Sequence, residues 1–201
     1  MSAREQILNT LRANTRETYD MPDLDALEPI TFPDPVAEFI HKTTTTAGAS
    51  LIELNAGDDL NVVIRQAYPD AKVVASNVAG VQADINPDIV EDVRELMKVD
   101  VGVVEGAIGV AENACIWIPQ MTKEKAVCFA SQQIVILLSR DAIVSNMHEA
   151  YARIAASEVY FQKYPFGTFI SGPSKTADIE SALVYGAQAA RGVTVVLRGE
   201  R

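Results

Sequence analysis

The chain has 201 residues, with 27 acidic and 17 basic side chains and a net charge of -10 at pH 7. Apolar residues make up 48% and charged residues 22%, which is the balance of a globular protein with a packed core. Because an acidic surface repels phosphate backbones and anionic headgroups, we expect neither nucleic acid nor a membrane as a partner. A small anionic ligand stays possible if Lys175, Arg191 or Arg198 lines a cleft.

The first 35 residues predict a helical arm and a linker. Ser2 and Glu5 have capping-box spacing and precede a narrow apolar stripe, which predicts a short amphipathic helix. Four prolines between Thr18 and Pro35 then block regular structure. We therefore divide the chain into an N-terminal helix with a Pro-rich linker, residues 1–35, and an α/β domain, residues 36–201. The start lacks the apolar region of a signal peptide and no apolar run is long enough to span a bilayer, so the expected location is the cytoplasm.

Strands and helices alternate from Asp34 onward. Asp34 and Pro35 form an N-cap and first-turn pair for a helix that ends near Gly48. A β-α-β unit follows over residues 49–75. Further strands are predicted at 101–104, 115–118, 134–138, 168–170 and 193–197, and helices near 145–161 and 176–185. This alternation predicts an α/β fold with a mostly parallel sheet covered on both faces.

The two cysteines, Cys115 and Cys128, lie in apolar runs without CxxC spacing. We therefore expect reduced, buried thiols and no zinc site or iron–sulfur cluster built by this chain alone.

The segment from Ser171 to Glu180 is the first candidate site. A predicted strand runs through Gly172 and Pro173 into a predicted helix, and the amide groups at such a turn can bind a carboxylate or phosphate. Helix capping explains the same residue types, so both interpretations stay open. The candidate ligand-binding residues are Ser171, Ser174, Lys175, Thr176, Asp178 and Glu180.

Two further segments carry polar groups within apolar surroundings. Glu105, Glu112 and Asn113 interrupt the apolar stretch 101–115, where a carboxylate can serve as an acid, a base or a nucleophile, or simply cap an element. Gly186 and Gln188 lie in the segment 185–192, which we interpret as a helix end and a tight turn before the last strand.

The segment 171–180, together with Leu183-Val-Tyr-Gly-Ala187 and Arg191-Gly-Val-Thr-Val-Val-Leu197, resembles the C-terminal signature of the LutC/YkgG family, also called the LUD domain. The stretch 101–115 resembles that family's second motif. The resemblance implies a three-layer NagB/RpiA/CoA-transferase-like fold. It also implies a role in L-lactate utilisation beside iron–sulfur and oxidoreductase subunits, with any cluster held by the partner.

This sequence departs from the family pattern at several positions. The pattern usually has Thr at Val104, Thr-Gly at Asn113-Ala114, His at Gln133 and His-Gly-Pro at Gln188-Ala189-Ala190. Both histidines are thus replaced by glutamine, which removes the groups best suited to proton transfer near neutral pH. Binding is therefore expected more than catalysis.

Three hypotheses follow. The first is a lactate-utilisation component that binds a small carboxylate or a partner subunit through a crevice shared by residues 171–180, Glu105, Glu112 and Gln188. The second is an acyl- or CoA-transferase with Glu112 as its nucleophile, since Glu112-Asn113 resembles the Glu-Asn pair of CoA-transferases with this fold. The third is a metabolite-sensing module of the same fold, with a CoA ester or sugar phosphate among its possible ligands.

Overall fold

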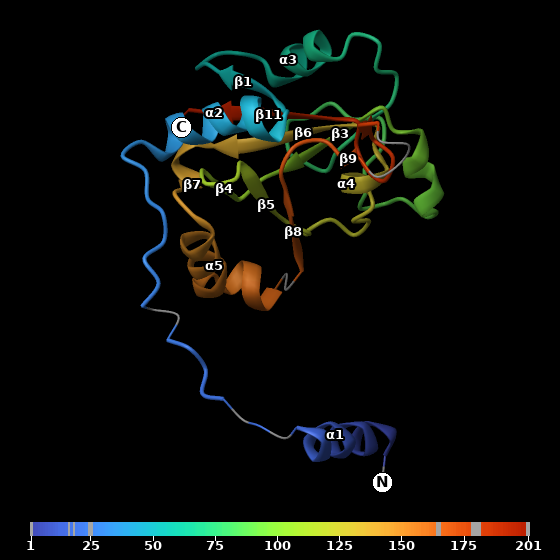
Figure 1. The fold of residues 1–201 in the computed structure, drawn as a ribbon. Coiled ribbons are helices and arrows are strands. Elements are labelled where there is room, and N and C mark those ends of the chain that lie inside the picture. The colour runs from blue at the N-terminus through green and yellow to red at the C-terminus, as the bar shows by residue number, and fades with distance from the viewer. Residues whose placement is uncertain are drawn as a thin grey trace.

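The computed structural model describes residues 2–15, 17, 19–23, 26–163, 166–177 and 182–199. Two sheets and the helices around them form the body of the protein, and the N-terminal helix lies apart from it (Figure 1). The described helices are α1 (Ala3–Asn14), α2 (Pro35–Lys42), η1 (Thr43–Ala47), α3 (Leu60–Ala67), η2 (Val93–Lys98), α4 (Val127–Ala130), η3 (Arg140–Ala142), α5 (Met147–Ala156) and η4 (Val159–Lys163). The described strands are β1 (Ser50–Leu54), β2 (Val74–Ala75), β3 (Val101–Glu105), β4 (Ile108–Val110), β5 (Cys115–Pro119), β6 (Gln133–Ser139), β7 (Ile143–Val144), β8 (Gly167–Ile170), β9 (Lys175–Thr176), β10 (Val184–Tyr185) and β11 (Gly192–Arg198).

Both predicted helix caps are confirmed. The Ser2 hydroxyl accepts the amide of Glu5, and the Glu5 carboxylate accepts the amide of Ser2 in return. At the start of α2, the Asp34 carboxylate accepts the amide of Ala37. Each cap satisfies amide groups that have no partner within the helix.

The central sheet consists of five parallel strands in the order β1-β11-β6-β3-β2. β11 inserts between β1 and β6, so the last strand of the sheet joins the first strand to the others. The five inner residues of β6 and of β11 are buried, and such unbroken burial is typical of parallel strands covered on both faces. The predicted mixed α/β fold with a mostly parallel sheet is confirmed.

The two faces of this sheet are covered differently. On one face, Ile64 of α3 packs against a cluster that includes Val103 and Leu137. On the other face, Phe39 of α2 and residues of a second sheet share one core with the central strands. α5 packs on the far side of that second sheet through Ala150, so the layers follow one another from α3 to α5 (Figure 1).

The second sheet is small and mixed, with the order β7-β4-β5-β8. β4 pairs parallel to β7, whereas β5 runs antiparallel to both β4 and β8. The predicted strands at 115–118 and 168–170 exist, but they belong to this sheet and not to the parallel one. A turn over residues 111–114 reverses the chain between β4 and β5, which gives the antiparallel pairing.

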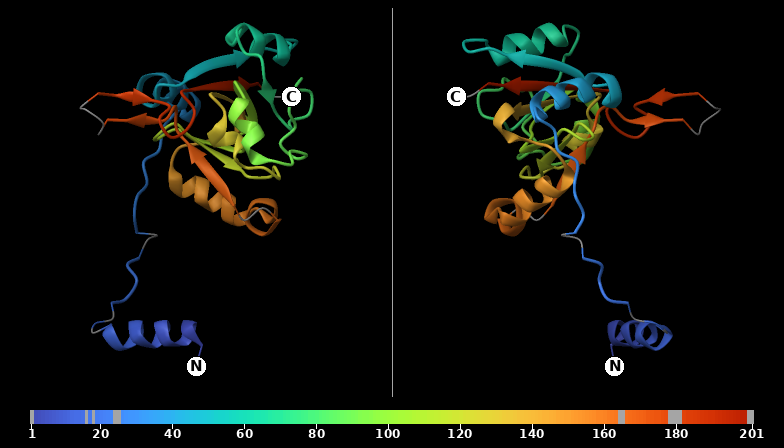
Figure 2. Two further views of the ribbon diagram at one scale, coloured as in Figure 1. Left: turned by 90° about the vertical axis from the view of Figure 1, so that its right-hand side faces the viewer. Right: turned by 60° about the vertical axis from the view of Figure 1, so that its left-hand side comes forward.

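The β-α-β unit predicted over residues 49–75 is confirmed, since β1 and β2 are parallel strands of one sheet and α3 crosses between them from one edge to the other. One prediction about a connection needs correction. The helix predicted at 176–185 is wrong for the residues described there. Lys175 and Thr176 instead pair antiparallel with Tyr185 and Val184 in a ribbon that projects from the body (Figure 2), as β-branched and aromatic residues favour.

The linker joins the body before α2 begins. The Asn146 side chain donates to the carbonyl of Ile30, and the amide of Phe32 donates to the Ser145 hydroxyl. The Phe32 ring packs against the main core. Over the described residues, every helix is too short or too polar to cross a membrane.

Candidate functional site

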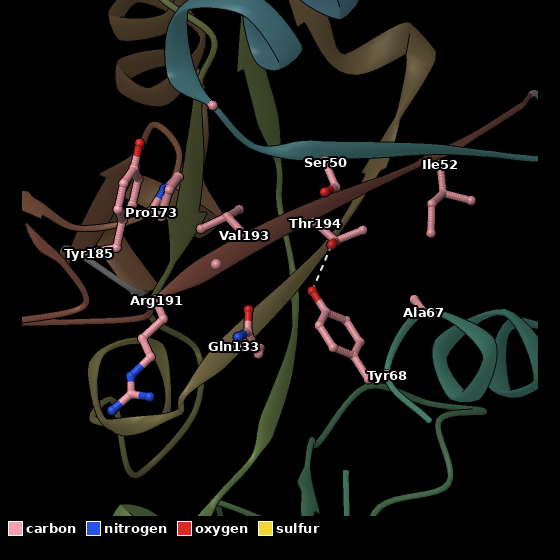
Figure 3. Close-up of a pocket in the computed structure, with 12 residues that line it drawn as sticks. Ser50, Ile52, Ala67, Tyr68, Gln133, Pro173, Tyr185, Arg191, Val193 and Thr194 are labelled. Atoms are coloured by element: carbon pink, nitrogen blue, oxygen red, sulfur yellow. Dashed lines mark hydrogen bonds between the residues drawn. The ribbon is translucent and has the colours of Figure 1, made fainter. Parts of the chain in front are cut away.

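A cavity of about 560 Å³, here called the amino-end cavity, opens where β1, β11 and β6 begin. Pro173 and Tyr185 lie at one end of it and Tyr68 at the other, with Gln133 and Thr194 between them (Figure 3). Pro173, Tyr185 and residues 191–194 of its lining belong to the C-terminal segments that resemble the LUD domain signature. The size and mixed lining of the cavity suit a small organic ligand.

Two glycines let the polar side chains of this cavity lie close to the backbone. A Cβ atom on Gly192 would lie 2.1 Å from the Gln133 Oε1 atom, and one on Gly186 would lie 2.2 Å from the Arg191 Cγ atom. Gly186 also has φ +76°, a conformation that favours glycine. The predicted binding residue Gly186 therefore acts through packing, because its missing side chain makes room for Arg191.

Tyr68 closes the opposite end of the cavity from the end of α3. Its hydroxyl lies 2.7 Å from the Thr194 hydroxyl, so the two groups are hydrogen-bonded. Burial raises the pKa of Tyr68, and the Thr194 hydrogen bond acts in the opposite direction to a smaller extent. The phenol is thus neutral at physiological pH and can donate or accept a hydrogen bond.

The three cations expected to serve an anionic ligand have different surroundings. The Lys175 ammonium donates to the carbonyl of Ala47 at 2.6 Å, and the Arg198 guanidinium forms an ion pair with Glu105. For Arg191, the described part of the chain provides no ion-pair partner, and Arg191 is one of the residues that line the amino-end cavity. Arg191 is therefore the cation whose charge is available to a ligand.

Glu105 lies at the other end of the parallel sheet. It ends β3 beside a cavity of about 760 Å³ formed where β1, β6 and β11 end, here called the carboxyl-end cavity. In contrast, the amide of Ser174 donates to the carbonyl of Ala190, which directly precedes β11 at its amino end. The predicted crevice shared by Glu105 and residues 171–176 is wrong, because the length of β11 separates them.

Glu112 holds two elements together. Its carboxylate accepts the amide of Met147, the first residue of α5, at 3.1 Å, and its carbonyl accepts the Lys42 ammonium. Such a carboxylate at a helix start is stabilising without any ligand. The proposed nucleophilic role of Glu112 stays a prediction.

The second family-like motif and the C-terminal one meet next to Glu112. The Ser171 hydroxyl donates to the carbonyl of Asn113 at 2.8 Å. Ala114 follows with φ +55°, the left-handed region that a glycine occupies without strain and where the family pattern has Gly. Ala114 thus adopts a backbone conformation that a glycine at this position would adopt without strain.

The remaining predicted site residues are dispersed. Ser174 faces a mainly apolar cavity of about 270 Å³ that also involves Ser171, whereas Thr176 belongs to the ribbon. Gln188 is exposed in the turn after β10, away from Glu112. Asp178 and Glu180 lie outside the described residues.

The two thiols are shielded. Burial raises the pKa of Cys115 to about 12, and burial likewise raises the pKa of Cys128. Both cysteines are free and buried, so neither is a ready thiolate ligand or nucleophile. Within the described ranges, His, Cys, Asp and Glu side chains do not gather into a group of three that could hold a metal ion.

Comparison with known families and solved structures agrees with the family resemblance and with the fold. The model of the LUD domain matches residues 34–197, which is most of the chain. The chain belongs to the LUD domain family. A crystal structure of a DUF162 family protein from Deinococcus radiodurans has a similar fold, with a TM-score of 0.63, 17% sequence identity, and coverage of 82% of this chain and 98% of that one. No curated protein matches the sequence.

Sequence reasoning did not single out Tyr68 and Thr194 of this LUD domain. Tyr68 follows α3 and precedes Pro69, and an aromatic residue at a helix end before proline is a weak signal for a cavity wall. Thr194 is a polar residue inside an otherwise aliphatic strand, and its burial at 4% exposure needs a partner. That interruption of β11 was the signal available in the sequence.

Proposed function

We propose that this LUD domain protein is the LutC-like component of an L-lactate oxidation system and that it binds a small carboxylate in the amino-end cavity. The family is associated with lactate utilisation. The observation that supports a carboxylate ligand is Arg191, which is one of the residues that line the cavity, whereas the other two candidate cations bind groups of the protein itself. A guanidinium can bind both oxygens of a carboxylate at once.

The other polar groups of the cavity suit the rest of a hydroxy acid. The Gln133 amide can donate and accept, and the Tyr68 hydroxyl reaches from the opposite end to the Thr194 hydroxyl. A carboxylate bound by Arg191 would therefore leave its hydroxyl or keto oxygen within a region that offers both donors and acceptors.

Electron transfer is assigned to partner subunits in this proposal. Cys115 and Cys128 are buried thiols with raised pKa values and so are poor ligands for an iron–sulfur cluster. We propose an iron–sulfur subunit and an oxidoreductase subunit as the partners, with this chain supplying carboxylate binding.

Ligand binding is tested by thermal unfolding of the full chain with L-lactate, D-lactate, pyruvate and lactamide, which resembles lactate but lacks the carboxylate. A ligand that binds only the folded state raises Tm, so L-lactate or pyruvate is expected to raise it and lactamide is not. Arg191→Gln is expected to weaken affinity by about ten- to a hundredfold through loss of a charge-assisted hydrogen bond. Arg153→Gln, on the exposed side of α5, is the matched control. Equal shifts with lactate and lactamide, or an unchanged affinity in Arg191→Gln, would contradict the proposed site.

The role in lactate oxidation is tested separately in the native host. Deletion of the gene is expected to impair growth on L-lactate, and the tagged chain is expected to recover an iron–sulfur protein. Normal growth on lactate together with recovery of no such partner would refute the cellular role, whatever the binding result.

A further inference from the structure

The N-terminal helix α1 has an apolar stripe without a partner. Within the described residues no side chain of α1 is buried, and Ile7 and Leu11 are 62% and 60% exposed. Leu8 lies on the same face as these two side chains. A helix of this length is marginal in water by itself, so α1 gains stability from any surface that covers this stripe.

The body of the protein exposes an apolar surface of matching kind, here called the η2 patch. Its members are Ile89, Val93, Met97, Met121 and Phe129, each between 41% and 74% exposed. α4, which carries Phe129, packs against η2. The amide of Glu124, before α4, donates to the carbonyl of Pro87, before η2, so the segments that lead into the two helices are also hydrogen-bonded. The left view of Figure 2 shows this side of the body. Apolar side chains exposed on neighbouring segments in this way mark interaction sites.

We propose that α1 docks on the η2 patch of its own chain, with Ile7, Leu8 and Leu11 covering Val93 and Met97. Charge favours this pairing. Residues 2–16 contain three arginines and one glutamate, whereas residues 84–98 contain five carboxylates and two cations. Arg4 continues the line of the stripe one turn before Leu8, and Arg12 lies beside the stripe, so both basic side chains would then face an acidic surround.

The length of the linker permits this contact. The chain is attached to the body at Ile30 and Phe32, so the segment from Thr15 to Pro29 is the tether. About 15 extended residues span roughly 50 Å. A domain of about 170 residues has a radius of gyration of only about 15 Å, so the tether can reach any side of the body.

The tether also decides between the same chain and a second copy. A linker of about 15 residues holds the arm at an effective concentration in the millimolar range near its own body. Docking on a second copy would have to compete with that concentration. The intramolecular contact therefore prevails at ordinary protein concentrations.

Methionine methyl NMR with a spin label tests the proposal on the full chain. Ala13→Cys places a nitroxide on the face of α1 opposite the stripe, and the buried native thiols Cys115 and Cys128 stay unlabelled. The Met97 and Met121 methyl signals are expected to lose intensity in the labelled chain. Met147, which begins α5, is the internal control and is expected to keep its intensity.

Two surface variants make this result specific. Ile7→Asp with Leu11→Asp is expected to restore the Met97 and Met121 signals, whereas Thr10→Asp, which adds charge outside the stripe, is expected to leave them weakened. Undiminished signals, or equal loss at Met97 and Met147, would refute docking on the η2 patch. A further sample mixes spin-labelled chains with chains that carry the ¹³C-methyl groups but no spin label. Equal signal loss in this mixture would show that the arm docks on a second copy, which would also overturn the proposal.

Discussion

The two ends of the parallel sheet each present an arginine from β11 or the residue before it, yet the two arginines have opposite surroundings. Arg198 at the carboxyl end is paired with Glu105, and its side chain is 24% exposed. Arg191 at the amino end is exposed, lines a cavity and has no ion-pair partner among the described residues. Ligands of open α/β sheets usually bind beyond the carboxyl ends of the strands. In this protein the available charge lies at the amino end instead.

The different surroundings of the two arginines predict that Arg198 contributes to the stability of the fold and Arg191 to ligand binding. A half-buried guanidinium that is paired within the protein contributes to folding, whereas an exposed one contributes little to folding and can bind a ligand. The same residue type in the same strand region can therefore serve two purposes, and substitutions should separate them.

The largest effect on stability is expected at the carboxyl end. Arg198→Gln leaves the Glu105 carboxylate half-buried without its partner, so the free energy of unfolding should fall by about 1–2 kcal/mol. Arg191→Gln should change it by less than about 0.5 kcal/mol, as at most exposed positions. Urea denaturation of both variants measures this contrast. The double variant Glu105→Gln with Arg198→Gln should recover part of the loss, and equal losses in the two single variants would remove the distinction between the ends.

A somewhat smaller effect is expected from Gln133→His, which introduces the imidazole of the family pattern into the amino-end cavity. A protonated imidazole beside Arg191 adds positive charge, so carboxylate affinity should rise by up to about tenfold as pH falls through about 6.5. Titration calorimetry with L-lactate between pH 5.5 and 8 tests this. Gln132→His, on the neighbouring exposed residue, should leave the affinity nearly independent of pH. The same slope in both variants would mean that residue 133 does not face the ligand.

The smallest effect concerns Asp100, which precedes β3 at the amino end. Its carboxylate accepts the amides of Lys72 and Val73 at 2.8 and 2.9 Å, and these bonds lower the pKa of Asp100. A lowered pKa stabilises the fold above the unfolded-state value of about 3.9, and this stabilisation is lost as pH falls through the folded-state pKa.

Asp100→Asn should therefore cost about 1 kcal/mol at pH 7, at the low end for such bonds because the site is exposed, and progressively less towards pH 3. Urea denaturation across this pH range provides the measurement. Asp70→Asn, on a nearby exposed residue, is the control and should show neither the cost nor its dependence on pH. A cost for Asp100→Asn that stays constant down to pH 3 would exclude the carboxylate as its cause.

Local features of this protein could be predicted from the sequence because they depend on neighbouring residues. The caps formed by Ser2 and Asp34 follow from side chains that reach amides two or three positions away. The aliphatic strands β6 and β11 follow from runs of buried residues. The family was recognisable from the segments around residues 171 and 191.

Features that depend on distant pairing could not be predicted in this way. Capping residues occur in turns as well as at helix starts, so Ser174 and Thr176 suggested the start of a helix over 176–185, whereas Thr176 pairs with Val184 across a ribbon. The separation of Glu105 from Ser174 depends on the strand order, which no local pattern encodes. The insertion of β11 between β1 and β6 separates Ser174, near the amino end of β11, from Glu105, at the carboxyl end of the sheet.

The position of β11 also has a consequence for how the chain folds. β1 pairs with β11 alone within the described sheet, so roughly 140 residues must be synthesised before β1 finds its neighbour. Such long-range parallel pairing slows folding and leaves strand edges exposed in the meantime. Until β11 arrives, β1 and β6 both present unpaired edges, and the amino-end cavity does not exist. If the proposed carboxylate binds in that cavity, its binding reports completion of the sheet.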